Sequence, residues 1–313
     1  MRILDTSEIK ASEIDGLGHM NVRFYAERAQ RANRVLLAEL GLGGDEGETP
    51  GLRVSQTDTY CRYHREQFKG QTLSVSGGVL EVGPAEVRTF YEIANPAKGE
   101  IAATFIIKST VSDRATGGPA PLANAVRAAA EAQRIELPEH GRPRTVDLGP
   151  PRLDLDYDVV AARLVDDPTD PMSRRSEWTV TPELCDENGV LADTGALMFG
   201  GARPPSAEEM RRHGPMTFIG DSGHRLGWAS LETRMVRVSA ARAGDMLSSI
   251  GAEIGLHRKV RHSRRWLFNL TRGQLVSLND NVSIALDLDA RRAIDIPPSL
   301  RAKLEARHTP EFA

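Results

Sequence analysis

A short polar segment near the amino terminus holds the residues best suited to acid–base chemistry, namely Asp15, His19 and Asn21. The segment follows a strand-like stretch and leads into a helical one, so the first helical amides have no partner within the helix. The positive end of the helix dipole faces the same region. Such amides can bind the oxyanion that forms when a carbonyl carbon is attacked. The sequence therefore predicts a site for attack on a carbonyl group.

Each polar residue of this segment has a predicted role. Asp15 is the expected nucleophile or the base that activates water, and both roles stay open. His19 is expected to polarise the substrate or move a proton, and Asn21 to hold water or a carbonyl group. An isolated aspartate before a helix is usually an N-cap or turn residue. Because all three occur in order between a strand and an amphipathic helix, the pattern favours catalysis.

The helix after this segment is well marked. Apolar residues at spacings of three and four form one stripe, and charged residues occupy other positions. Small alanines in the stripe would let a sheet wrap closely around the helix. Glycines at 41, 43 and 44 predict its end. The stripe consists of Val22, Tyr25, Ala29, Ala32, Leu36 and Leu40.

The chain contains a weak internal repeat. An Asp-x-x-Gly sequence follows a strand-like stretch at Asp15 and again at Asp186, which are 171 positions apart (186 − 15). A glycine turn between two strand-like stretches occurs at Gly70 and again at Gly244, 174 positions apart (244 − 70). A nearly constant offset across separate features indicates two copies of one structural plan.

Long stretches of alternating apolar and polar residues follow each glycine turn and predict half-buried antiparallel strands. They span 72–82, 87–94 and 100–111 in the first copy, and 246–256, 265–272 and 281–289 in the second. Each copy thus has one strand, one long helix and several meander strands. This order, with the helix across a curved sheet, is the hotdog arrangement of the α+β class. We expect two tandem hotdog domains that form an internal pseudo-dimer.

The predicted boundaries follow from composition. Residues 1–136 form the first hotdog, with the fuller polar motif, and residues 172–313 form the second. Residues 137–171, rich in proline and aspartate, are expected to be a linker and lead-in. The second helix is expected to begin near Thr194 and to break at Pro204 and Pro205. A short closing helix is expected over 299–307.

Residues 15–25, DGLGHMNVRFY, resemble the Asp-x-x-Gly-His-x-Asn-Asn-x-x-Tyr pattern of the 4-hydroxybenzoyl-CoA thioesterase-like family. They are also similar to the Asp-x-Asn-x-His-x-Asn-Asn pattern of plant-type acyl-ACP thioesterases, which likewise join two hotdogs in one chain. The second family asparagine is Val22 here, and the plant-type asparagine is Leu17, so substrate positioning is expected to differ. The resemblance implies hydrolysis of an acyl thioester, either acyl-CoA or an acyl-carrier thioester, without metal or cofactor.

The resemblance also implies residues that bind the substrate. The amide of Val22 is the expected oxyanion donor, and Arg23 and Tyr25 are further candidates. Tyr25 lies one turn into the helix, where a packing role is favoured over a binding role.

The second copy has a less complete motif. Asp186 occupies the position of the first aspartate, but Val190 and Ala192 stand where the first copy has histidine and asparagine. Asp193 could replace a lost group, so Asp186 and Asp193 are candidate substrate-binding residues. We expect this second site to be degenerate and the copy to serve as a structural partner.

Composition narrows the function further. The formal net charge of −3 argues against nucleic acid as the main partner. The basic segment 257–266 is an exception, either docking coenzyme A phosphates or forming a solvated hairpin connection. Only two cysteines occur, Cys61 and Cys185, without companions at metal-ligand spacing, so neither a disulfide framework nor a zinc site is expected.

The sequence also bears on location and assembly. No apolar run approaches the roughly 20 residues that cross a bilayer, and the charged start MRILDTSEIK is unlike a signal peptide. We therefore expect a cytoplasmic protein that does not bind membranes, with a homodimer of chains as one possible assembly. The acyl group cannot be deduced from the sequence.

Two other functions stay open at this stage. A hotdog hydratase acting on enoyl or hydroxyacyl thioesters would carry an Asp-x-Asn-Pro-x-His run, whereas this chain has Gly16-Leu17-Gly18. A protein that binds acyl thioesters without turnover would fit the degenerate second copy and Val22. Both are ranked below hydrolysis.

Overall fold

The computed structural model describes residues 1–43, 51–164, 176–185, 189–191, 218–221, 223 and 225–313. The chain divides into two compact units, Met1–Arg144 and Thr145–Ala313. The positions expected for the second helix, together with Asp186, Ala192 and Asp193, lie outside the described residues.

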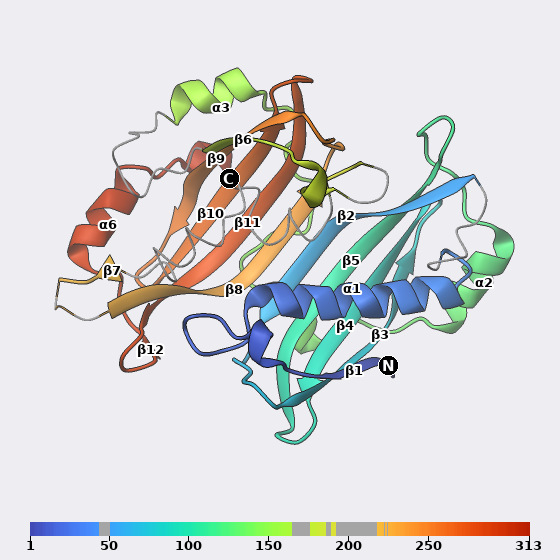
Figure 1. Cartoon of the computed structure of the whole chain (residues 1–313), viewed down its shortest axis with the longest axis horizontal. Helices are drawn as coiled ribbons and strands as arrows, with labels where there is room; N and C mark the ends of the chain where they lie inside the picture. The colour runs from blue at the N-terminus through green and yellow to red at the C-terminus, as the bar shows by residue number, and fades with distance from the viewer. Residues whose placement is uncertain (44–50, 165–175, 186–188, 192–217, 222, 224) are drawn as a thin grey trace. The chain divides into compact units, whose positions relative to one another are not determined.

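The described part of the first unit is an antiparallel sheet with one long helix lying across one face (Figure 1). The strand order is β1-β3-β4-β5-β2. The long helix is α1 (Val22–Glu39), and a shorter helix, α2 (Asn124–Ala132), follows the last strand. Short 3-10 turns are η1 (Ala11–Glu13) and η2 (Glu139–Gly141). The strands are β1 (Arg2–Glu8), β2 (Leu52–Tyr63), β3 (Thr72–Val82), β4 (Glu86–Asn95) and β5 (Glu100–Asp113).

Helix α1 packs on the sheet through the apolar stripe that its sequence predicts. Ala29, Ala32 and Leu36 are completely buried, because the small alanines allow the sheet to approach the helix closely. The helix ends at Glu39 with Leu40 as its C-cap, and Gly41 follows with φ of 81°, a conformation that favours glycine.

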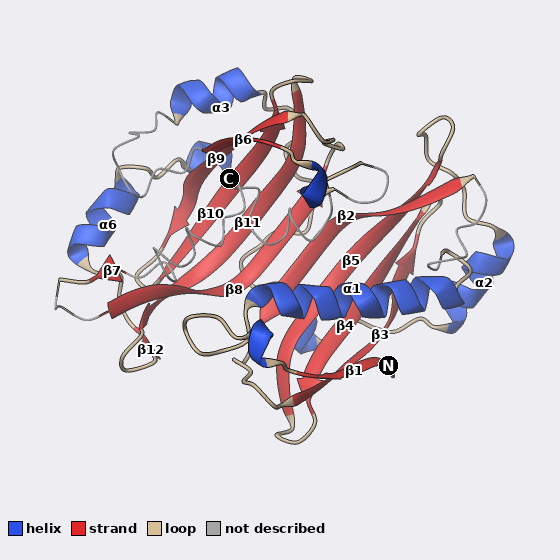
Figure 2. Ribbon diagram, viewed as in Figure 1, coloured by secondary structure: helices blue, strands red, loops and turns tan. Residues whose placement is uncertain are grey.

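The described part of the second unit is also mainly an antiparallel sheet, with strand order β8-β11-β10-β9-β6 (Figure 2). Two short strands, β7 and β12, pair with β8 and β11. Helices α3 (Tyr157–Arg163) and α6 (Pro298–Glu305) and the turns η3 (Pro182–Leu184) and η4 (Pro310–Phe312) complete the described elements. The strands are β6 (Ser176–Thr179), β7 (Phe218–Ile219), β8 (Arg225–Arg237), β9 (Met246–Leu256), β10 (Val260–Asn269), β11 (Gln274–Asp287) and β12 (Arg292–Ala293).

The core of the second unit includes residues outside the strands. Trp266 on β10 is 1% exposed and meets Phe312 of η4 edge to face, with ring centroids 5.4 Å apart. Val160 of α3 belongs to the same buried cluster. Helix α3 lies in the segment that we predicted to be an irregular lead-in, so that part of the prediction was incomplete. The predicted closing helix is observed as α6.

The basic segment is a strand rather than a solvated connection. Only residues 257–259 form the turn, and β10 begins at Val260. Arg264 donates two hydrogen bonds to Asp280 on β11, at 2.8 Å and 3.1 Å. Arg261 lies 3.5 Å from a carboxylate oxygen of Glu253. Both guanidinium groups therefore interact with carboxylates of their own unit, which weakens the interpretation of this segment as a coenzyme A phosphate site.

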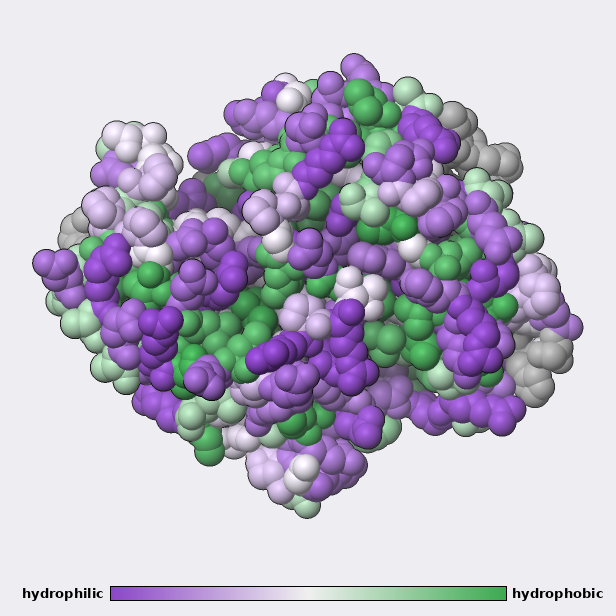
Figure 3. Space-filling model, turned by 180° about the vertical axis from the view of Figure 1, so that it is seen from behind, coloured by the Kyte–Doolittle hydropathy of each residue, from purple (hydrophilic) through white to green (hydrophobic). Residues whose placement is uncertain are grey.

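The surface is mostly hydrophilic on the side drawn in Figure 3, and hydrophobic residues occur there in separate patches. Isolated exposed apolar residues are normal for folded proteins. Among the described helices, none is both long enough and apolar enough to cross a membrane. The exposed large apolar residues are Met1, Ile3, Val22, Val35, Phe68, Leu153, Val159, Val238 and Met246.

Candidate active site

The predicted catalytic segment is a tight loop between η1 and α1. The amide of Asp15 donates to the carbonyl oxygen of His19 at 3.0 Å, and the amide of Gly18 donates to the carbonyl oxygen of Asp15 at 3.0 Å. Ile14 and Met20 form an antiparallel bridge at its base. Gly18 has φ of 84°, a left-handed conformation that glycine adopts readily. The loop therefore turns back on itself and brings its polar side chains together.

The carboxylate of Asp15 lies at the centre of this loop. Its Oδ1 accepts a hydrogen bond from the amide of Leu17 at 2.9 Å. Its Oδ2 accepts one from Nδ2 of Asn21 at 3.4 Å and lies 3.7 Å from Nδ1 of His19. The side chain of Asp15 is 21% exposed. The structure thus brings the three predicted catalytic residues together, with the carboxylate partly open to solvent.

Asn21 also begins helix α1. Its Oδ1 accepts a hydrogen bond from the amide of Arg23 at 3.0 Å, and its carbonyl oxygen accepts one from Phe24 at 3.0 Å. In the part of the chain that the structure describes, the amide of Val22 has no hydrogen-bond partner. Val22 is also 37% exposed. Its amide is therefore a first-turn donor that is free to donate to a bound group, which is the property required of the predicted oxyanion donor.

A residue that the sequence did not single out joins the site. Oε1 of Glu66 lies 3.6 Å from Nε2 of His19, on the opposite side of the imidazole from Asp15. The side chain of His19 is 17% exposed and that of Glu66 is 38% exposed. His19 therefore lies between two carboxylates, an arrangement that can orient the ring.

The segment that carries Glu66 is held in place by buried polar contacts. The amide of Met20 donates to the carbonyl oxygen of Gln67 at 2.7 Å. The Gln67 side chain in turn accepts a hydrogen bond from Nδ2 of Asn95 at 2.9 Å, and both side chains are buried. No spacing in the sequence connects positions 19 and 66, so only the folded structure reveals this pair.

Tyr25 and Arg23 have different environments. Tyr25 is 3% exposed, and its hydroxyl donates to the carbonyl oxygen of Arg65 at 3.4 Å. Burial raises the pKa of the Tyr25 hydroxyl above its ordinary range. This side chain therefore ties α1 to the segment bearing Glu66. Arg23 is exposed and pairs with Glu27 on the next helical turn at 2.5 Å.

The arrangement can perform acyl-transfer chemistry without further groups. It offers a carboxylate, an imidazole held between two carboxylates, a carboxamide and an unpaired helix amide around one loop. Among the described histidines, cysteines and carboxylates, no cluster is arranged to hold a metal ion.

Most of the first unit is similar in sequence to a known protein family. Residues 9–130 match the sequence model of the Thioesterase-like superfamily. The matched range includes the loop from Asp15 to Asn21, α1 and the segment bearing Glu66, so the candidate site lies wholly within the matched residues. No curated protein matches the chain by sequence.

Solved structures support the fold of the whole chain. A 12:0-ACP thioesterase from Umbellularia californica is similar with a TM-score of 0.64 and 13% identity, covering 90% of this chain and 93% of that one. An acyl-ACP thioesterase from Bacteroides thetaiotaomicron has a TM-score of 0.64 and 11% identity, covering 89% and 96%. At such low identity the likeness establishes the fold alone. The chain is therefore a double hotdog of the α+β class, as its internal repeat predicts.

Proposed function

We propose that this chain hydrolyses an acyl thioester to a free acid and a thiol, and that Asp15, His19 and Asn21 carry the reaction. The observation that supports this most directly is the Asp15 carboxylate beside His19 and Asn21 at the start of α1, within a thioesterase-like domain. A carbonyl group placed there would face both the carboxylate and the unpaired amide of Val22.

The reaction proceeds by addition to the thioester carbonyl followed by loss of the thiolate. In the general-base route, Asp15 takes a proton from water as the water oxygen adds to the carbonyl carbon. The amide of Val22 stabilises the resulting oxyanion. Collapse of this intermediate breaks the carbon–sulfur bond, and His19 delivers a proton to the leaving sulfur. Asn21 holds the water or the carbonyl group.

In the alternative route, Asp15 attacks the carbonyl carbon itself and forms an acyl anhydride, which water then hydrolyses. The two routes differ in one observable. Rapid quenching followed by mass measurement would detect an acylated Asp15 only in the nucleophilic route.

We propose coenzyme A as the thiol carrier, with an acyl-carrier protein as the alternative. The two similar structures are named as thioesterases for acyl-carrier substrates, so both carriers belong in the test. Purified protein is incubated with a panel of acyl-CoA and acyl-carrier thioesters while release of free thiol is followed. We expect turnover of at least one acyl thioester. Binding without turnover across the panel would instead support a non-catalytic acyl-thioester-binding protein.

A substitution tests the role of Asp15. We expect Asp15→Asn to lower kcat about 1,000-fold or more while the protein stays folded, because the amide can neither accept the proton nor attack. Asp154→Asn is the matched control, since Asp154 is exposed and pairs only with nearby Arg152. Near-normal turnover by Asp15→Asn would remove Asp15 from the mechanism.

We propose that residues 1–136 hold the active site and that residues 172–313 act as a structural partner joined through 137–171. Val190, which stands where the first copy has His19, is 1% exposed and cannot replace an imidazole. Replacing Asp186 or Asp193 by asparagine should therefore leave kcat within about twofold. A cytoplasmic location and a homodimer of chains stay predictions, which cell fractionation and sedimentation would test.

A further inference from the structure

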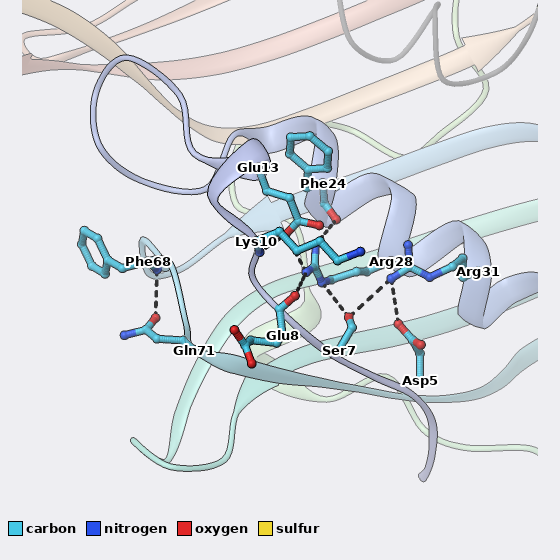
Figure 4. Close-up of polar contacts among 10 residues, drawn as sticks. All are labelled: Asp5, Ser7, Glu8, Lys10, Glu13, Phe24, Arg28, Arg31, Phe68 and Gln71. Carbon is cyan, nitrogen blue, oxygen red and sulfur yellow. Dashed lines mark hydrogen bonds and ion pairs between the residues drawn. The ribbon is translucent and has the colours of Figure 1, made fainter.

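Arg28 is a charged residue buried beneath the start of α1. Only 1% of its surface is exposed. Its Nε donates to the Ser7 hydroxyl at 3.1 Å, and its Nη1 donates to the Phe24 carbonyl oxygen at 3.1 Å. Its Nη2 donates to the Glu8 carbonyl oxygen at 3.3 Å and to Oε2 of Glu13 at 2.8 Å (Figure 4). One guanidinium therefore joins β1, the η1 turn and α1.

Glu13 extends this contact to the catalytic loop. Its carbonyl oxygen accepts a hydrogen bond from the amide of Asn21 at 2.9 Å. Its Oε2 also accepts one from the amide of Lys10 at 3.3 Å. The Nδ2 of Asn21 donates to Asp15 at 3.4 Å. A continuous series of contacts thus runs from Arg28 through Glu13 and Asn21 to the Asp15 carboxylate.

The burial of Arg28 makes its ion pair with Glu13 costly to break. A buried guanidinium must keep hydrogen-bond acceptors around it, because leaving a charge unpaired in the interior is costly. The Glu13 side chain is only 14% exposed, so this pair is not a surface contact that opens freely into solvent. The loop from Asp15 to His19 is itself partly exposed, and its two ends meet at Glu13 and Asn21.

We propose that the Arg28–Glu13 ion pair is a positioning pair that sets the orientation of Asp15 and His19 for catalysis. The effect of this pair reaches the reaction through the backbone of Asn21 and the closure of the loop. This proposal rests on the proposed thioester hydrolysis.

Arg31, three residues along the same helix, provides a control that also contacts β1 but is more exposed, with 39% of its side chain accessible against 1% for Arg28. Its Nη2 donates to Asp5 on β1 at 3.0 Å and to the Ser7 hydroxyl at 3.4 Å. Figure 4 shows Arg28 and Arg31 side by side, with only Arg28 joined to Glu13. Both arginines hold α1 against β1, and only Arg28 is linked to the catalytic loop.

The test compares Arg28→Met, Glu13→Gln and Arg31→Met in the full chain. Each variant is measured for Tm, for kcat and KM with the thioester that the wild type hydrolyses fastest, and for the pH dependence of kcat. For Arg28→Met and Glu13→Gln, we expect kcat to fall about tenfold or more with KM changed less than about threefold, because misplacement of reacting groups slows the chemical step. The pH profile of kcat should also shift, since the distance from His19 to Asp15 changes. Arg31→Met should keep kcat within about twofold.

A conservative variant covers the case in which Arg28→Met fails to fold. Arg28→Lys keeps a positive charge that can reach Glu13 but loses the fork that contacts Ser7 and Phe24. If Arg28→Met folds, we expect Arg28→Lys to have a higher kcat than Arg28→Met. If Arg28→Met does not fold, we expect the kcat of Arg28→Lys to be about threefold lower than that of the wild type. Equal losses of kcat in the Arg28 and Arg31 variants, or an unshifted pH profile in every variant, would overturn the proposal.

Hydrogen exchange separates this proposal from the proposed function. If the wild type hydrolyses no thioester, the proposed function fails, and the positioning pair is then judged on the exchange rates of amides 15–21. Faster exchange there in Arg28→Met than in Arg31→Met supports the pair. Equal exchange in the two variants would overturn it.

Discussion

The hydroxyl of Tyr91 on β4 donates a 2.7 Å hydrogen bond to Oδ1 of Asn33 on α1, and both side chains are completely buried. Thr89 also donates to this oxygen at 3.2 Å, and Nδ2 of Asn33 donates to Ser109 at 3.3 Å. The interface between α1 and the sheet is therefore not purely apolar. These hydrogen bonds form only when α1 has one particular orientation about its own axis. They therefore fix the orientation of its first turn at the candidate site.

Replacing Asn33 by leucine should destabilise the first unit. The change leaves the Tyr91 hydroxyl without its acceptor in a buried position, which costs about 1–3 kcal/mol in the free energy of unfolding. Denaturant unfolding with a probe in the first unit measures this loss. Arg34→Leu, at an exposed position of the same helix, is the control and should change the free energy by less than about 0.5 kcal/mol. Equal stability of the two variants would show that the network does not support the fold.

Replacing Gly77 by alanine should also be destabilising. A Cβ atom there would lie 2.5 Å from Cδ1 of Tyr91 and 2.6 Å from the Phe90 carbonyl oxygen. The added methyl group must displace the ring that bonds to Asn33, so we expect a loss of about 1–3 kcal/mol. Gly118→Ala is the control, since its nearest neighbour would be 3.6 Å away. A Tm unchanged by the Gly77 substitution would contradict the close approach.

The local elements could be predicted because each has a signal in consecutive residues. The apolar stripe predicted the helix that is observed as α1. The alternation over 72–82 predicted a strand that is observed, with the same bounds, as β3. The proximity of Asp15, His19 and Asn21 was predictable for the same reason, since they lie within seven positions of the sequence.

Contacts between distant residues could not be predicted in this way. Glu66 meets His19 because the amide of Met20 bonds to Gln67 across the fold. Arg264 meets Asp280 because β10 and β11 pair in one register. The sequence shows that these residues are charged, but their partners depend on strand order and helix rotation. For this reason the strand and the carboxylate partners of the basic segment could not be deduced from its composition.

His19 and its partner Glu66 should contribute differently to turnover. We expect His19→Gln to lower kcat about 100-fold, as is typical for loss of a proton-transfer group. Glu66→Gln should lower it about tenfold, because the ring keeps Asp15 as a partner. Steady-state kinetics of thiol release measures both. Glu81→Gln is the control, since Glu81 is exposed on β3 and should leave kcat unchanged. A Glu66→Gln enzyme as active as this control would exclude Glu66 from the site.

Acid should destabilise the first unit through His64. Burial lowers the pKa of His64 from 6.5 to about 4, with nearby Arg62 and His140 adding to the effect. As pH falls from 6.5 toward 4, the unfolded chain therefore binds a proton that the folded chain does not. The free energy of unfolding must then decrease over this range. Denaturant unfolding at several pH values should show a shallower decrease for His64→Gln than for the wild type, and parallel curves would contradict the assignment.

The buried carboxylate of Asp280 should stabilise the second unit only while it is charged. Asp280 is 5% exposed, accepts two hydrogen bonds from Arg264 and lies 3.4 Å from Nε2 of His262. Burial alone would raise its pKa, but the interactions with His262 and Arg264 outweigh this and hold the pKa below the ordinary aspartate value. The charged Asp280 carboxylate therefore stabilises the folded second unit near neutral pH. This stabilisation is lost as the pH falls from the ordinary aspartate pKa toward the lower pKa of Asp280 in the folded chain.

Asp280→Asn should cost about 3–5 kcal/mol near neutral pH, because it leaves a buried guanidinium without its carboxylate. Asp295→Asn is the control, since Asp295 is 55% exposed in its pairs with Arg258 and Lys259, and surface pairs contribute about 1 kcal/mol or less. Denaturant unfolding with a probe in the second unit, at neutral and acidic pH, measures both variants. The gap between wild type and Asp280→Asn should narrow in acid, because protonation removes the same charge from the wild type. A gap that stays constant with pH would mean that packing, not the charge, accounts for the loss.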